Sequence, residues 1–71
     1  MNNGERKNVE YQMCVCGSFY TALFAAIYSA DNENLQLLKK VYPEEVVSAY
    51  RFQNEPGYFD RLESEWRAED G

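Results

Sequence analysis

The hydrophobic pattern starts with a run of 18 uncharged residues, 13–30, and then changes to apolar positions at helical spacing. Residues 18–30 would be apolar around almost the whole circumference of a helix. A helix without a polar face must be enclosed by other elements or must meet another chain. We therefore expect residues 18–30 to form the central core helix, with Phe19 and Leu23 on one side and Phe24, Ile27 and Tyr28 on others.

Capping and helix-breaking residues divide the next part of the chain into two helices. Asp31 is a favourable N-cap for a helix that Pro43 should end. Pro43 also suits the first position of the following helix, because its missing N–H needs no partner there. That second helix should run to about Asn54.

A turn at residues 54–57, which includes Pro56 and Gly57, predicts a break before a last helix. In that helix Phe59, Leu62 and Trp66 are spaced three and four apart and share one face. The apolar positions of the whole chain then predict a small core. Its expected members are Leu23, Ile27, Leu38, Val47, Leu62 and Trp66.

The segment before the uncharged run is polar and predicts no regular element. Residues 1–12 mix charges with asparagine and glycine, which is typical of a frayed terminus. A short strand within residues 9–15 stays open as an alternative. The expected fold is all-α: a small bundle of three to four short helices with a disordered or extended N-terminal arm. The arm covers residues 1–16, the helical domain residues 17–68, and a disordered tail residues 69–71.

The uncharged run raises two alternatives, a membrane span and a cleavable signal. Its 18 residues reach the lower limit for a span, but a helix over residues 18–30 would rise only about 20 Å, against about 30 Å of hydrocarbon. A signal peptide needs a basic leader and small residues before the cleavage site. The charges at residues 5–10 balance, and bulky Tyr28 stands where a small residue belongs. We expect a cytoplasmic protein with no membrane span.

The small size of the chain and its aromatic content predict that it binds a second protein subunit. A chain of 71 residues has room for one small domain, and such domains often gain stability from a second subunit. Aromatic side chains are enriched at protein contact sites. Tyr20, Phe24 and Tyr28 lie four apart on the expected core helix, and we expect them to bind a partner. The predicted function is a non-catalytic interaction module that self-associates or binds another protein.

The net charge of −5 suggests an alternative function. Residues 1–43 contain four acids and four bases, whereas residues 44–71 contain eight acids and three bases. Such a surface would repel nucleic acid. Helix starts and ion pairs account for many of these acids. The alternative is an acidic inhibitor that binds a basic protein surface or imitates nucleic acid, with Glu63, Glu65 and Glu69 as its acidic face.

Candidate chemistry is sparse. The chain has no histidine, the commonest general base and metal ligand, so we expect no enzyme and infer no small-molecule substrate. Cys14 and Cys16 supply only half of a tetrahedral zinc site, although a thiol at a helix start can be reactive. We expect both cysteines to be reduced and dispensable for folding, with no bound metal or cofactor.

Three stretches carry a resemblance to other proteins: SFYTALFAAIYSAD, NENLQLLKKVYPEEVVSAYRFQ and NEPGYFDRLESEW. Together they span residues 18–66, and the chain there resembles short, uncharacterised helical proteins of bacterial genomes, phages and other mobile elements. The shared marks are an aromatic first helix that ends in Ala-Asp, a Tyr-Pro-Glu-Glu helix start and a Gly-Tyr-Phe start to the last helix. These are packing and capping features. The resemblance therefore implies a helical fold, and it implies no function or site residues.

Overall fold

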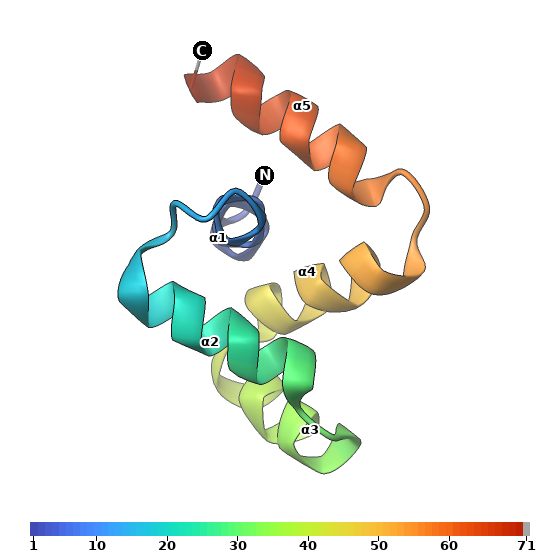
Figure 1. Ribbon diagram of the computed structural model, residues 1–71. Helices are drawn as coiled ribbons and strands as arrows, with labels where there is room; N and C mark the ends of the chain where they lie inside the picture. Colours follow the sequence, from blue (N-terminus) through green and yellow to red (C-terminus); the bar gives the residue numbers. More distant parts are fainter. Residues whose placement is uncertain (71) are drawn as a thin grey trace.

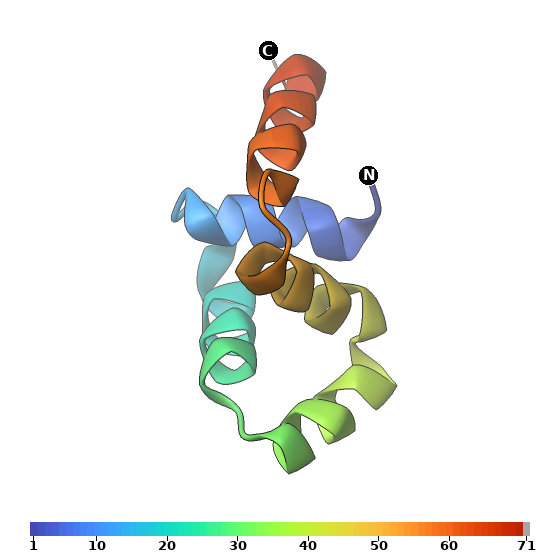
Figure 2. The same ribbon diagram turned by 90° about the vertical axis from the view of Figure 1, so that its right-hand side faces the viewer.

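The computed structural model describes residues 1–70, which form five helices and no strand. The helices are α1 (Asn3–Gln12), α2 (Gly17–Ser29), α3 (Asn32–Val41), α4 (Pro43–Asn54) and α5 (Tyr58–Asp70). The all-α prediction is confirmed, with one helix more than expected. Figure 2 shows α2, α3 and α4 as three sides of a triangle, with α1 and α5 on the side of α4 away from α3.

The additional helix is α1, and the prediction of a disordered or extended arm over residues 1–16 is wrong. A capping box starts this helix: the Asn2 side chain accepts a hydrogen bond from the Glu5 backbone N–H at 2.7 Å, and the Glu5 carboxylate accepts one from the Asn2 N–H at 3.0 Å. Two backbone donors that a helix start normally leaves unpaired are thereby satisfied. The polar composition of this segment thus belongs to a helix rather than to a frayed terminus.

α1 lies at the centre of the molecule, where α2 had been expected. It packs against α2, α4 and α5, and Figure 1 shows it nearly end-on among them. Its residues Gly4, Asn8 and Val9 are buried. Gly4 is required by the close approach of α4, because a Cβ atom built on it would lie 2.5 Å from the Glu45 backbone nitrogen. A mostly polar helix therefore occupies the centre of the molecule, and it contacts its neighbours through a few buried residues.

The end of α1 is a Schellman motif with a cysteine at its left-handed position. The Cys14 N–H donates to the Tyr11 carbonyl at 3.0 Å, and the Val15 N–H donates to the Glu10 carbonyl at 2.8 Å. Cys14 has φ +62°, a conformation in which glycine is the usual residue. The chain turns sharply there, and the α1 and α2 axes meet at 92°.

Replacing Cys14 with glycine should stabilise the protein by about 1 kcal/mol, because a non-glycine residue in the left-handed region costs about 1–2 kcal/mol and part of that gain is lost to the flexibility of glycine in the unfolded chain. Thermal unfolding of Cys14→Gly measures the change. Val15→Gly is the matched control, since Val15 is exposed and has no positive φ. A Cys14→Gly variant that unfolds at a lower temperature than the wild type would contradict this account of the turn.

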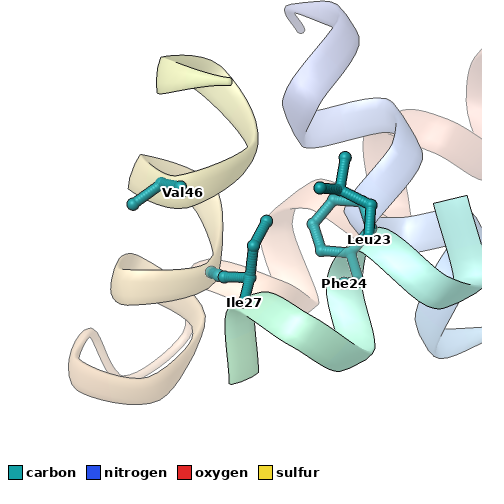
Figure 3. Close-up of a cluster of buried hydrophobic side chains, with 5 residues drawn as sticks. Leu23, Phe24, Ile27 and Val46 are labelled. Atoms are coloured by element: carbon teal, nitrogen blue, oxygen red, sulfur yellow. The ribbon is translucent and has the colours of Figure 1, made fainter. Parts of the chain in front are cut away.

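Two hydrophobic clusters hold the helices together. One joins α2 to α4, and Figure 3 shows Ile27 of α2 directed towards Val46 of α4. Its buried members are Leu23, Phe24, Ile27, Val46 and Ala49. The other joins α1 to α5, and its buried members are Val9, Tyr58 and Leu62.

The predicted core is confirmed in part. Three expected members are buried: Leu23, Ile27 and Leu62. Leu38 and Trp66 are half-buried and pack against the edges of the two clusters. Val47 was wrongly predicted to be a core residue, because it is 43% exposed and Val46 faces the core instead. Adjacent residues lie about 100° apart around a helix, so the Val46-Val47 pair could present only one of its members to the core.

Two further expectations concern a disordered C-terminal tail and the absence of a membrane span. α5 continues through Asp70, so the expected tail at residues 69–71 is wrong for its first two residues, and Gly71 lies outside the described part of the chain. Within residues 1–70, no single helix is long and apolar enough to cross a membrane. Only α1 and α2 together, as a bent pair, meet the criteria of length and composition.

Candidate protein-binding face

The face expected to bind a partner, formed by Tyr20, Phe24 and Tyr28, is covered by α1. Phe24 is 0% exposed and stacks on Tyr11 of α1, with ring centroids 5.4 Å apart. Tyr28 stacks on the same tyrosine at 5.8 Å, and Tyr20 lies beneath the Lys7 ammonium at 5.1 Å. These contacts are typical aromatic and cation–π pairs. Phe24 therefore cannot contact another chain in this fold, because α1, the segment expected to be an arm, covers it.

A buried polar network connects the two hydrophobic clusters. The Tyr28 hydroxyl donates to the Asn8 side-chain oxygen at 2.8 Å, and the Asn8 amide donates to the Ser48 hydroxyl at 3.0 Å. Ser48 and Tyr58 are 2.8 Å apart, and the Tyr58 hydroxyl donates to the Glu5 carboxylate at 3.2 Å. An ionised carboxylate can only accept, so Ser48 is the donor to Tyr58.

All buried polar side-chain atoms of the described residues except one have a hydrogen-bond partner. The one without a partner is the indole Nε1 of Trp66. Because buried polar groups without partners are costly, a fully paired network requires α1, α2, α4 and α5 to meet in one arrangement. Its members touch one another, and we assign it a structural role rather than a binding role.

Burial within this network raises the pKa of Tyr28 to about 12, even though the hydrogen bond that its oxygen accepts from the Gln12 side chain acts in the opposite direction. Burial also raises the pKa of Tyr58, again against a hydrogen bond to Ser48. Taking a phenol out of water disfavours its charged form. Both hydroxyls therefore keep their protons, and their roles as donors, to a higher pH than an exposed tyrosine would.

Stability should fall above pH 10. The unfolded chain ionises Tyr28 near its ordinary pKa of 10, whereas the folded chain holds that proton to about pH 12. The free energy of unfolding is thus unaffected below pH 10 and decreases as pH rises towards 12. Absorbance at 295 nm, recorded together with circular dichroism, should show a late tyrosine ionisation that coincides with loss of helix. Ionisation of all six tyrosines near pH 10 with the helices intact would contradict the prediction.

The opposite side of α2 is exposed and forms a groove with α3. The groove has a volume of about 610 Å³ and is largely apolar. Its lining includes Ala26, Ala30, Asn34, Leu37, Leu38 and Val41. Leu37 and Val41 are 53% and 69% exposed, and Phe19 is 57% exposed near Tyr42, with ring centroids 6.2 Å apart. We call this surface the α2–α3 face: the groove together with Phe19, Leu37 and Val41.

Small and polar residues complete the α2–α3 face. Ala26 and Ser29 of α2 are exposed and line the groove, so its α2 side is formed by small side chains. A second, smaller groove of about 210 Å³ lies between α3 and α4, beside the exposed Val47 and Tyr50. The α2–α3 face is the larger apolar surface of the two, and it faces away from α1 and α5.

Of the residues predicted to form an acidic face, only Glu65 and Glu69, which are one turn apart, share a side of α5. Glu63 pairs with Arg67 at 2.7 Å, and Glu69 pairs with Arg6 of α1 at 2.9 Å. Glu65 is exposed, but it is two positions from Glu63 and therefore about 200° from it around the helix. The Glu69 pair instead ties α5 to the first turns of α1.

The cysteines and the other candidate ligands remain dispersed. Cys14 is exposed, Cys16 is buried, and both are free. The Cys16 sulfur lies 3.3 Å from the Thr21 hydroxyl, which itself donates to the Gly17 carbonyl at 2.7 Å. Within residues 1–70 no group of three or more cysteine, histidine, aspartate or glutamate residues could hold a metal ion.

Sequence reasoning recognised the unusual α2 helix but did not foresee that α1 packs on its Tyr20, Phe24 and Tyr28 side. The missed signal was the Asn2-to-Glu5 spacing, which matches a capping box and would have indicated α1. With α1 present, Tyr20, Phe24 and Tyr28 pack against it, and the other side of α2 stays exposed. Comparisons with protein-family models, curated proteins and solved structures found no match to this chain.

Proposed function

We propose that the chain is a non-catalytic interaction module that binds an amphipathic helix of a protein in the groove of the α2–α3 face. The observation that carries this proposal is the exposure of Leu37 and Val41 beside an apolar groove. Contiguous exposed apolar surface on a small protein is typical of interaction sites. Laying the apolar side of a helix into a hydrophobic groove is a recurrent recognition mode.

The shape of the groove supports a helical occupant. Ala26 and Ala30 form one side and would let an incoming helix approach the α2 backbone closely. Leu37 and Val41 lie one turn apart on α3 and could pack along that helix. Polar groups lie at the Asp31 end of the groove, where they could fix the position of a bound segment.

The acidic alternative has weaker support. Two of its three residues, Glu63 and Glu69, already pair with arginines of the same chain. A basic partner would have to compete with these ion pairs. It would also leave the α2–α3 face uncovered, and we therefore favour apolar recognition.

Photo-crosslinking of the full chain in its host cells tests the proposal. A benzophenone amino acid in place of Leu37 should form a crosslink to protein, and the same group in place of the exposed Ser64 on α5 should not. Ala26→Arg, which fills the groove, should abolish the crosslink. Ala25→Arg adds the same charge at an exposed position outside the groove and should preserve it. Absence of any crosslink from position 37, or its persistence in Ala26→Arg, would reject the proposed function.

A further inference from the structure

We infer that the helix bound in this groove is α3 of a second copy of the chain, packed antiparallel to the first α3 about a two-fold axis. This inference rests on the proposed function and identifies its partner. α3 contributes both parts of the contact, since it lines the groove and also carries the protruding Leu37 and Val41. A surface that contains both a groove and the side chains to fill it meets the requirement of a two-fold interface, in which the same patch is used twice.

The charges of α3 favour an antiparallel pair. Its N-terminal end is acidic, with Asp31 and Glu33, and its last turn is basic, with Lys39 and Lys40. Antiparallel packing places each acidic end beside the basic end of the other copy, and it also opposes the two helix dipoles favourably. Parallel packing would bring like charges together.

The spacing of these charges defines a register. Glu33 and Lys40 are seven residues apart, so they lie on the same edge of the helix beside Leu37. If Leu37 packs opposite Asn34 of the other copy, Lys40 lies beside Glu33 of the other copy. The two-fold axis repeats this ion pair. In the same register Val41 lies opposite Ala30 of the other copy, and Ala30 is part of the groove.

Overall charge does not prevent this contact. Residues 17–42, which form the α2–α3 face, contain two acids and two bases. The excess of eight acids over three bases lies in residues 44–71, beyond this face. The net charge of −5 on each copy therefore opposes association at long range, but it leaves the contact surface itself neutral.

Sedimentation equilibrium of the purified full chain, from about 10 to 500 μM in low salt, tests the inference. The wild type should form a dimer. Glu33→Lys and Lys40→Glu should each weaken dimerisation about three- to tenfold, because each places like charges in both symmetric pairs. The double variant should recover wild-type affinity within about twofold. Leu37→Asp, at an exposed position that should not affect folding, should abolish the dimer, and circular dichroism checks that its helices remain.

Lys39→Glu is the matched control, because it changes the net charge as Lys40→Glu does but lies by the other groove, towards α4. It should leave the dimer unchanged, and a loss equal to that of Lys40→Glu would overturn the register. A strict monomer at 500 μM, or a double variant without recovery, would overturn the inference. A monomer whose position-37 crosslink joins a different protein would leave the proposed function standing. A monomer that forms no crosslink would contradict both the dimer inference and the proposed function.

Discussion

Replacing Asn8 with alanine should lower the free energy of unfolding by about 3 kcal/mol. Asn8 accepts from Tyr28 and donates to Ser48, so its loss leaves the Tyr28 O–H without an acceptor and the Ser48 oxygen without a donor. Each buried group that loses its hydrogen bond costs about 1–3 kcal/mol. The loss should occur even though alanine is the better helix former. Chemical denaturation followed by circular dichroism measures it.

The control for this variant is Asn3→Ala, which makes the same change at an exposed position of the same helix. Its effect should be within about 0.5 kcal/mol of zero. A wild-type midpoint for Asn8→Ala would mean that the polar network does not hold α1 in place. The central position of α1 would then have to rest on Val9 and its apolar neighbours alone.

Replacing Gly4 with alanine should also destabilise the protein, by about 2 kcal/mol. The added methyl group would meet the backbone of α4 at Glu44 and Glu45, which cannot move aside as a flexible side chain can. Overpacking of this kind costs about 1–3 kcal/mol, and the helix propensity of alanine recovers less than about 1 kcal/mol. In a domain of this size the melting temperature should fall by roughly 10 °C.

Thermal unfolding of Gly4→Ala, with Asn3→Ala beside it, measures the effect. Both variants add an alanine to the first turn of α1, but only the first adds an atom at the contact with α4. Equal stabilities of the two variants would show that α1 and α4 are further apart than described. A more stable Gly4→Ala would show that helix propensity outweighs packing at this position.

Local capping chemistry allowed most of the helices to be predicted from the sequence. Asp31 accepts a hydrogen bond from the Asn34 N–H at 2.8 Å and starts α3, and Pro43 is the first residue of α4. Both features depend on residues close in the chain, which a sequence displays directly. The α1 helix was missed because its burial depends on distant partners. Asn8 becomes a core residue only because Ser48, 40 positions away, lies opposite it.

The outward face of α2 could not be predicted for a related reason. Periodicity selects a buried face only when the other face is polar, and α2 has apolar residues on all sides. Which side is covered depends on where Tyr11 of α1 packs, and it packs on Phe24 rather than near Phe19. A tertiary contact thus determines which side of α2 stays exposed.

Amide hydrogen exchange across α1 tests the central claim most directly: that this polar segment is the central helix, covers Phe24 and leaves the other side of α2 exposed. Slow exchange requires stable hydrogen bonds that open only in larger unfolding events. The amides of Asn8 and Val9 should therefore exchange as slowly as that of Ala49 in the core of α4. Exchange of residues 3–12 at the rate of an unstructured peptide, while α4 stays protected, would contradict the account.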